Sequence, residues 1–337
     1  MNRLIVYNEQ VAAACFDYRN GVIEDYHPIV PELLPRQIAD TSADGFSYWL
    51  QQRSIDLNNV RHRELMNTLF GTRDRIALAI LTNMFSLTDT FTCFPEGCYL
   101  PRETLCDIKQ QDRVSDFILV SSDTSLQRAK IITPNASTDG SFSKTWKYQD
   151  GAWWLYKLQS AEASKTEYEI SMALRAAGWD AAEYRYDGNK RTRVRTRNFV
   201  GEHEFFEPYD SFRFAFADKT DQPDVVRNNL ASLGGGFEQA WRRILLADAL
   251  FMNTDRHMRN FGVIRSSRTG KVLRLAPNFD NNQAYRAVQG VRYSSAMLKE
   301  YMDSADQSDR SDLAVLHDQC AKRAYLKEAA EAARRFL

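Results

Sequence analysis

The chain has 337 residues, of which 44% are hydrophobic, so it exceeds the usual size of a single core and two lobes are expected. Lysine plus arginine and aspartate plus glutamate each number 44, and this balance argues against general electrostatic attraction to nucleic acid or an anionic membrane. No apolar run approaches the roughly 18 residues of a membrane span, and the N-terminal MNRLIVYNEQ lacks a signal-peptide core, so we expect a soluble, cytoplasmic protein.

The cysteines argue against a zinc site. The five are Cys15, Cys93, Cys98, Cys106 and Cys320, and no two of them form a C-x-x-C pair. No histidine lies near the three central cysteines, and a fourth ligand is missing. Free, mostly buried thiols in a reducing compartment are the expected state.

The N-terminal third predicts a small sheet followed by helices. Short strands are expected at Leu4 to Tyr7 and at Ala12 to Asp17, before the turn Asn20-Gly21. From Asp44 to Phe85 the apolar residues recur at helical spacing. The segment Ser86 to Phe91 closes this helical block, and we assign no chemistry to it.

A hairpin is predicted near the middle of the chain. Its strands are Thr145 to Tyr148 and Trp153 to Leu158, and Asp150-Gly151 forms the turn. By the period of two, Lys157 shares one face of the second strand with an aromatic and an aliphatic residue. A lysine on such a face either extends its charge to solvent at a sheet edge or has an anionic partner.

The helix after this hairpin offers an anionic partner. Ser164-x-x-Glu167 has the form of a capping box, and predicts a helix that opens there and stops at Gly178. Glu167 lies on the apolar stripe, so it can point back at the sheet, and Glu169 is the second choice. A strand lysine paired with a helix glutamate fixes nucleotide phosphates in kinases. Capping alone would also explain Glu167.

The most basic run of the chain is Lys190 to Arg197, in which arginines occupy alternate positions. A strand here has one arginine face and one packing face. That arginine face is interpreted either as a solvated sheet face or as a surface for DNA or an acidic partner. Asn198 to Val200 then leaves the strand, where a two-lobed kinase would have its hinge.

The most informative stretch is Asn253 to Asp280. A largely buried helix, expected from Gly236 to about Phe251, leads the chain into it. Phe261 to Ile264 and Val272 to Leu275 predict two strands, and the polar, glycine-ended segment between them predicts a hairpin turn. A hairpin returns the chain to where it started, so residues on its two flanks meet.

Asn260 and Asp280 flank the predicted hairpin, and Asp255 lies in the loop leading in. A carboxylate beside a carboxamide is a reasonable hard-oxygen site for Mg²⁺. The remaining carboxylate can orient or deprotonate a hydroxyl. Each residue alone also suits an ordinary Asx-rich loop, but the order Asp, four residues, Asn, hairpin, Asp is that of a kinase active site. His257 is interpreted as a packed histidine that braces the loop, with proton transfer as the alternative.

This stretch resembles the catalytic core of the HipA-like serine/threonine kinases, a group that includes bacterial persistence toxins. In that family a D-x-H-x-x-N loop precedes a hairpin and an aspartate. The matching residues are Asp255, His257, Asn260 and Asp280. The resemblance implies that Asp255 positions the acceptor hydroxyl and that Asn260 and Asp280 hold the metal.

The resemblance extends upstream to Ser137 through Lys144, which looks like the family's phosphate-covering loop, S-x-x-G-x-x-x-K. It implies that the first serine of this loop can be autophosphorylated. Asp139 departs from the pattern, since a carboxylate would repel phosphates unless it points away or reaches the metal. The nucleotide-binding residues that the resemblance implies are Ser137, Gly140, Ser141, Lys157 and Glu167.

These observations predict an α+β, bilobal, protein-kinase-like fold of HipA-like type, with a strand-rich N-lobe and a helical C-lobe. The expected divisions are an N-terminal sheet and helical extension over 1–110, a kinase N-lobe with the phosphate loop over 111–200, and a helical C-lobe with the catalytic loop over 201–337. Amphipathic helices are expected at Ser295 to Met302 and at Ser311 to Phe336.

The predicted function is an ATP- and Mg²⁺-dependent serine/threonine kinase that acts on a protein acceptor. Autophosphorylation at Ser137 and a toxin role in a toxin–antitoxin system are properties that the resemblance raises. The alternative is a catalytically weak nucleotide-binding regulatory protein that binds an antitoxin or DNA. A small-molecule kinase would use the same residues and differ only in its acceptor.

Overall fold

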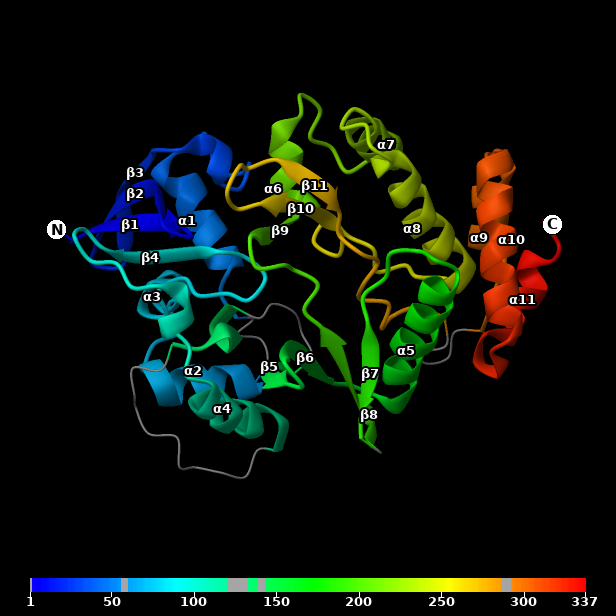
Figure 1. Cartoon of the computed structure of the whole chain (residues 1–337), viewed down its shortest axis with the longest axis horizontal. Coiled ribbons are helices and arrows are strands. Elements are labelled where there is room, and N and C mark those ends of the chain that lie inside the picture. The colour runs from blue at the N-terminus through cyan, green and yellow to red at the C-terminus, as the bar shows by residue number, and fades with distance from the viewer. Residues whose placement is uncertain (1, 56–59, 121–131, 138–142, 189, 286–291) are drawn as a thin grey trace.

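The computed structural model describes residues 2–55, 60–120, 132–137, 143–188, 190–285 and 292–337. Within these ranges the strands form three antiparallel sheets, and the helices pack around them (Figure 1). None of the helices in these ranges has the length and apolar content of a membrane span.

The first sheet and its helices form the N-terminal unit of the chain. The strands run in the order β3-β2-β1-β4. Their bounds are β1 Asn2–Asn8, β2 Val11–Arg19, β3 Val22–Pro28 and β4 Phe91–Pro95. The predicted turn Asn20-Gly21 joins β2 to β3 with both residues at positive φ, which is the geometry of a two-residue hairpin loop. The helices that follow β3 in the chain are α1 Ala43–Gln52, α2 Val60–Phe70 and α3 Arg75–Leu81. Residues of α1 and α3 pack in the core of this sheet, whereas α2 packs in a separate core with α4 (Ile108–Val120).

Helix α1 covers the first sheet because Phe46, Trp49 and Leu50 lie on one face and are buried against it. Phe205 from β9 completes this core, so the N-terminal unit packs directly on the third sheet. Two 3₁₀ turns lie in this region, at Pro31–Leu33 and Arg102–Thr104.

The second sheet has the order β5-β6-β8-β7. Its strands are β5 Ser143–Gln149, β6 Ala152–Leu158, β7 Tyr184–Asp187 and β8 Lys190–Arg197. Helix α4 (Ile108–Val120) packs beside β5, and a 3₁₀ turn at Pro134–Ser137 precedes that strand. Helix α5 (Ala161–Ala176) packs on β7 and β8.

The start of α5 corrects the predicted capping box. The helix begins one turn earlier, where the Ser160 hydroxyl accepts a hydrogen bond from the backbone N–H of Ala163. Ser164 lies inside the helix and is buried. Ser160 is also a good capping residue, but it has no Glu or Gln three positions later, and this hid the true start. The predicted stop is confirmed, because Gly178 follows the helix with φ of +75°.

The third sheet has the order β11-β10-β9. Its strands are β9 Glu204–Pro208, β10 Gly262–Ser266 and β11 Val272–Leu275. Around it lie α6 Tyr209–Phe212, a 3₁₀ turn at Arg213–Ala215, α7 Pro223–Ala231 and α8 Phe237–Phe251. The segment 198–203 connects β8 of the second sheet to β9 of the third.

The C-terminal residues form α9 (Ala296–Asp303), α10 (Gln307–Ala321) and α11 (Lys327–Ala333). The single helix predicted from Ser311 to Phe336 is therefore wrong. A 3₁₀ turn at Ala324–Leu326 separates two helices, and an Asp306 capping box opens the first of them. The break lets the leucines of α10 and the alanines of α11 pack into the same core, which a straight helix could not do.

The buried guanidinium of Arg265 forms an ion pair within the third sheet and hydrogen bonds that fasten this sheet to the N-terminal unit. Arg265 on β10 is fully buried, and its Nη1 lies 2.6 Å from Oε2 of Glu207, which is 1% exposed. The same guanidinium donates to the backbone carbonyls of Leu34 and Glu32, at 2.8 and 2.7 Å. Each nitrogen of this guanidinium therefore donates at least one hydrogen bond to a protein oxygen.

We expect Arg265→Ala to lower the free energy of unfolding by about 3–5 kcal/mol, because it leaves the Glu207 carboxylate buried without its charge partner. Arg274→Ala is the matched control on the neighbouring strand. Its guanidinium is 40% exposed and pairs with Glu204, so about 1 kcal/mol or less is expected. Urea denaturation of both variants measures the difference, and equal losses would show that burial of the Arg265 pair is unimportant.

Candidate active site

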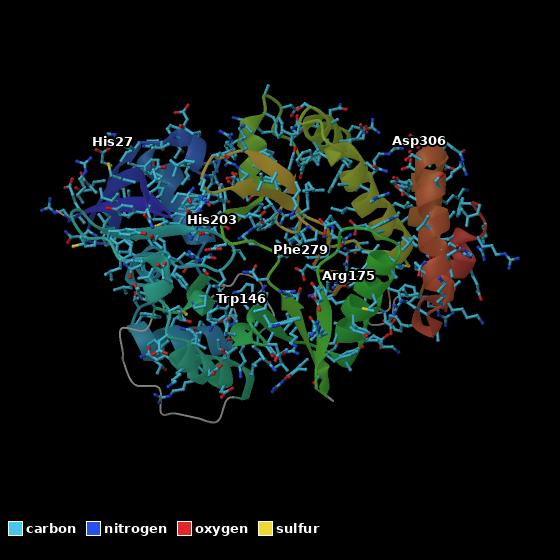
Figure 2. The ribbon with its side chains drawn as sticks, in the orientation of Figure 1. His27, Trp146, Arg175, His203, Phe279 and Asp306 are labelled. Carbon is cyan, nitrogen blue, oxygen red and sulfur yellow. The ribbon has the colours of Figure 1, made fainter. Side chains whose placement is uncertain are left out.

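A cleft of about 640 Å³ lies at the centre of the molecule, and all three sheets contribute to its walls. Trp146 on β5 and Phe279, both labelled in Figure 2, line it from the second sheet and from the chain after β11. The predicted site residues that line the cleft are Ser137, Lys157, Asp255, Asn260 and Asp280. Gly140 and Ser141, and most of the predicted phosphate loop, lie outside the described residues.

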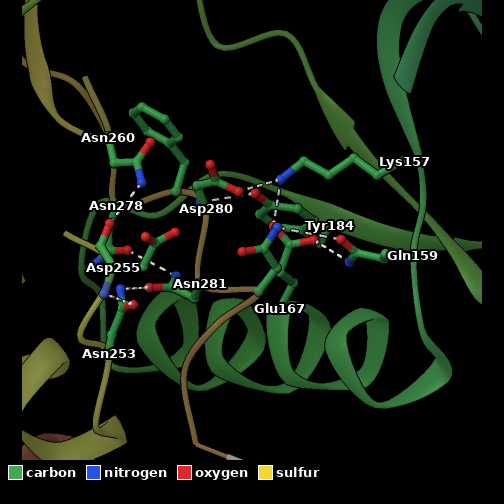
Figure 3. Close-up of polar contacts among 12 residues, drawn as sticks. Lys157, Gln159, Glu167, Tyr184, Asn253, Asp255, Asn260, Asn278, Asp280 and Asn281 are labelled. Carbon is green, nitrogen blue, oxygen red and sulfur yellow. Dashed lines mark hydrogen bonds and ion pairs between the residues drawn. The ribbon is translucent and has the colours of Figure 1, made fainter. Parts of the chain in front are cut away.

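Lys157 links the two sides of this cleft. Its Nζ donates to Oε1 of Glu167 at 2.6 Å and to Oδ1 of Asp280 at 2.7 Å (Figure 3). The ammonium is 6% exposed and Glu167 is fully buried. The second carboxylate oxygen of Glu167 accepts a hydrogen bond from the amide of Gln159 at 2.7 Å. Glu169, the other candidate partner, instead pairs with Arg323 at 2.9 Å.

The pKa values of Lys157, Glu167 and Asp280 depend on one another. Burial acts to lower the pKa of Lys157, but Asp280 and Glu167 outweigh it and hold the pKa well above its usual range. Burial acts to raise the pKa of Asp280, but Lys157 and then Lys144 outweigh it and lower the pKa to about 2. Complete burial raises the pKa of Glu167. At neutral pH the cleft therefore presents an ammonium and the Asp280 carboxylate in their charged forms.

The low pKa of Asp280 predicts a specific acid sensitivity. The ordinary pKa is 3.8 and the folded value is about 2, so this carboxylate stabilises the fold above about pH 4 and the contribution disappears as pH falls toward 2. The difference between the unfolding free energies of the wild-type protein and the Asp280→Asn variant should fall by roughly 2 kcal/mol as the pH is lowered over that interval. Denaturation at several pH values measures it. Asp116→Asn, which removes an exposed carboxylate, is the control, and parallel curves for all three proteins would contradict the shift.

The loop that carries Asp255 is held by hydrogen bonds between neighbouring side chains and its backbone. Helix α8 ends at Met252, whose φ of +54° turns the chain out of the helix. The side-chain oxygen of Asn253 accepts the backbone N–H of Asp255 at 3.3 Å, and the amide of Asn260 donates to the Asp255 carbonyl at 3.0 Å. The Asp255 carboxylate is exposed in the cleft and makes no hydrogen bond to the described residues. It is free to receive a substrate group.

Arg256 holds both sides of the hairpin together, and sequence reasoning missed it. Its guanidinium makes two hydrogen bonds of 2.9 Å with Asp248 on α8. It also donates to the carbonyls of Asn260 and Phe279, both at 2.8 Å, and so fixes the residues on either flank of the hairpin. Asp248 on the apolar stripe of α8 was the available signal, because a buried carboxylate requires a partner.

No protein-family model and no curated protein sequence matches this chain. Among solved structures, it is similar to HipA in the complex of the Shewanella oneidensis MR-1 toxin–antitoxin system HipA and HipB with operator DNA. The TM-score is 0.60 at 12% identity, over 99% of this chain and 91% of that one.

The chain has a HipA-like kinase fold. The predicted bilobal α+β class is therefore confirmed. A second similar structure is the Helicobacter pylori proinflammatory kinase CtkA, with a TM-score of 0.45 and 13% identity over 57% of this chain and 89% of that one.

Two residues of this HipA-like cleft offer oxygen ligands for Mg²⁺. The amide nitrogen of Asn260 is held by the Asp255 carbonyl, which leaves Oδ1 available. Oδ1 of Asp280 bonds Lys157, while its other oxygen makes no hydrogen bond within the described residues. No cluster of three or more His, Cys, Asp or Glu side chains occurs in the described part of the chain. Such a sparse oxygen set fits Mg²⁺, which keeps several waters and binds substrate phosphates.

The conformation of Asp280 indicates a functional constraint. It is one of a few non-glycine residues with positive φ, at +60°, which costs of order 1 kcal/mol or more. Its N–H donates to the hydroxyl of Tyr184 at 3.2 Å, so a buried tyrosine of β7 holds the residue in this conformation. In this conformation the carboxylate accepts the hydrogen bond from Lys157.

Two arginines of the basic run Lys190 to Arg197 are engaged within the chain and are not part of a solvated face. Arg195 is 13% exposed and stacks over Trp154, 4.6 Å from the ring centroid. Arg193 is 15% exposed and donates to the carbonyl of Leu119 at 2.9 Å. Both guanidiniums are used within the chain, and Arg197 is exposed.

His257 also differs from its interpretation as a packed residue. It is exposed on the cleft, and Nδ1 accepts the backbone N–H of Arg259 at 3.2 Å. That bond places the proton of the neutral ring on Nε2.

Proposed function

We propose that this HipA-like protein is an ATP- and Mg²⁺-dependent kinase that transfers the γ-phosphoryl group to a serine or threonine hydroxyl. The observation that supports it best is Lys157, which bonds both Glu167 and Asp280 in the cleft that also contains Asp255 and Asn260. A buried ammonium, two oxygen ligands and an unpartnered carboxylate are the groups that phosphoryl transfer requires.

In this proposal Lys157 binds the phosphates, and Glu167 keeps it charged and oriented. Oxygens of Asn260 and Asp280 would hold Mg²⁺, which when bound would neutralise phosphate charge. The Asp255 carboxylate orients the acceptor hydroxyl and takes its proton as the new oxygen–phosphorus bond forms and the bond to ADP breaks. Positioning and charge stabilisation supply most of the rate, because the reaction needs little covalent help from the protein.

Ser137 is the proposed autophosphorylation site. It lines the cleft at the end of the 3₁₀ turn before β5, and its hydroxyl donates to the carbonyl of Pro134 at 2.8 Å. An antitoxin or DNA-binding partner belongs to the proposal because HipA of Shewanella oneidensis was solved with HipB and operator DNA. The acceptor is proposed to be a protein.

The proposal is tested by incubating the protein with γ-labelled ATP, with Mg²⁺ or with excess EDTA. We expect labelled protein with Mg²⁺, loss of labelling with EDTA, and recovery when Mg²⁺ is restored, because the metal neutralises the charge of the transferred group. Asp280→Asn should reduce labelling by at least about 100-fold at equal Mg²⁺. ATP affinity with no Mg²⁺-dependent transfer would instead support the alternative, a nucleotide-binding regulatory protein.

A further inference from the structure

Helix α5, which carries Glu167, lies between the second sheet and the C-terminal helices (Figure 1). Toward the sheet, Glu167 reaches Lys157 on β6, and the hydroxyl of Ser171 donates to the carbonyl of Ala182 at 2.5 Å. Toward the C-terminal helices, Ala173 packs in the core that α10 and α11 also form. The helix therefore has one face on the candidate active site and another on the C-terminal part of the chain.

The residues that bond the C-terminal helices follow one face of α5. Glu162, Thr166 and Glu169 are spaced by four and then three positions, and this spacing places them on the same side of a helix. All three bond residues 323–326, the break between α10 and α11, which we call the C-terminal turn. Glu167 is next to Thr166 in the sequence but points to the sheet instead.

Tyr325 is at the centre of these contacts. Its hydroxyl donates to Oε1 of Glu162 at 2.8 Å. Because that hydroxyl has only one proton, it accepts the hydrogen bond from the hydroxyl of Thr166, which lies 2.6 Å away. Thr166 is fully buried and Tyr325 is 6% exposed, so water is poorly placed to replace the bond between them. The ammonium of Lys165 lies 4.5 Å from the centroid of the tyrosine ring.

Arg323 provides a second attachment further along α5. Its Nη1 donates to Oε2 of Glu169 at 2.9 Å, and the two side chains are 22% and 19% exposed. The attachments at Thr166 and Glu169 come on either side of Glu167 in the sequence. A helix held at both points cannot rotate or slide along its axis without breaking these bonds.

The geometry of the Lys157–Glu167 pair depends on how α5 is oriented. Glu167 is fully buried, and its two oxygens accept hydrogen bonds from Lys157 at 2.6 Å and from Gln159 at 2.7 Å. A small rotation of α5 would lengthen both bonds. Groups that bind a substrate need neighbours that hold them within about 0.5 Å of their working position.

We infer that Tyr325 is a positioning residue for the Lys157–Glu167 pair, and that the C-terminal turn holds α5 in the orientation that binds nucleotide phosphates. Tyr325 does not line the cleft, so it acts through Glu167 and not by touching the nucleotide. This inference rests on the proposed kinase function, in which Lys157 binds the phosphates. It also gives the break between α10 and α11 a role in the site, because the break contains Tyr325.

The test compares Tyr325→Phe, which loses the hydroxyl and keeps the ring, with the wild-type full chain. We expect the Kd for ATP with Mg²⁺, measured by calorimetric titration, to rise about fivefold to tenfold, the effect of about one net hydrogen bond. Tyr293→Phe is the matched control, because its hydroxyl donates to the carbonyl of Leu250 on α8 at 3.1 Å and its ring packs against the same core. Its Kd should change less than about twofold. Affinity is measured where thermal unfolding shows both variants to be fully folded, so a loss of stability alone cannot change it.

A double-mutant cycle with Glu167→Gln distinguishes a positioning role from a general structural one. If Tyr325 acts through Glu167, adding Tyr325→Phe to Glu167→Gln should change the Kd for ATP less than about twofold further. An equal rise in both backgrounds would overturn the inference. So would an unchanged Kd in Tyr325→Phe alone, or an equal rise in Tyr293→Phe.

Nucleotide titration also separates this inference from the transfer reaction. ATP affinity that depends on Tyr325, in a protein without Asp255-dependent transfer, would contradict the kinase proposal and leave the positioning role standing. A wild-type protein that does not bind ATP would overturn both.

Discussion

Asp255→Ala is expected to slow phosphoryl transfer by about 100- to 10,000-fold while ATP affinity and stability change little. The carboxylate is exposed in the cleft and bonds none of the described residues, so its removal leaves no buried group without a partner. The loop keeps its shape through the Asn253 and Asn260 contacts to the backbone of Asp255. Initial rates with labelled ATP, nucleotide titration and thermal unfolding measure the three quantities.

Asp221→Ala is the control for this variant, since it removes an exposed carboxylate far along the chain from the loop. It should retain full activity. If Asp255→Ala transfers phosphate at the wild-type rate, Asp255 has no role in the mechanism. A large loss of stability in Asp255→Ala would show that the carboxylate is structural.

Lys157→Ala is expected to lower the free energy of unfolding by about 3–5 kcal/mol and to abolish ATP binding. Glu167 would remain fully buried with no cation beside it, and Asp280 would lose the same partner. The phosphates would lose the buried ammonium that bonds both carboxylates, so affinity and stability fall together. Denaturant unfolding and nucleotide titration measure the two effects.

The matched control is Lys147→Ala on the neighbouring strand β5. Lys147 pairs with Asp116 at 2.7 Å, but the side chains are 23% and 60% exposed. Exposed pairs contribute about 0–1 kcal/mol, so this variant should remain near wild type in stability and in ATP affinity. Similar losses of unfolding free energy and of ATP affinity in Lys147→Ala and Lys157→Ala would show that burial of the Lys157 ion pairs does not increase their contribution.

Local chemistry made much of the fold predictable. The Asn20-Gly21 and Asp150-Gly151 turns tolerate positive φ, and both join paired strands in the structure. The hairpin after Asn260 could be read because strand-forming residues flank a polar segment ending in Gly270, whose φ is +67°. Such signals lie within a few residues of one another, so no tertiary information is needed.

Contacts between distant residues could not be predicted in the same way. Arg53 and Asp89 are 36 positions apart, and the sequence around each residue contains no signal that predicts their pairing. Lys157 and Asp280 are separated by 123 positions, and only the order of a kinase motif connected them. The break between α10 and α11 likewise depends on the shape of the shared core, which the helical spacing does not record.

The proposed kinase mechanism requires one cleft to gather a nucleotide and a divalent metal between Lys157 and the residues Asn260 and Asp280. A crystal grown with a non-hydrolysable ATP analogue and Mn²⁺, recorded at the manganese edge, tests it most directly. We expect an anomalous peak within about 2–2.5 Å of oxygens of Asn260 and Asp280, with phosphates beside the Lys157 ammonium. Nucleotide density elsewhere, or a filled cleft with no manganese at these oxygens, would contradict it.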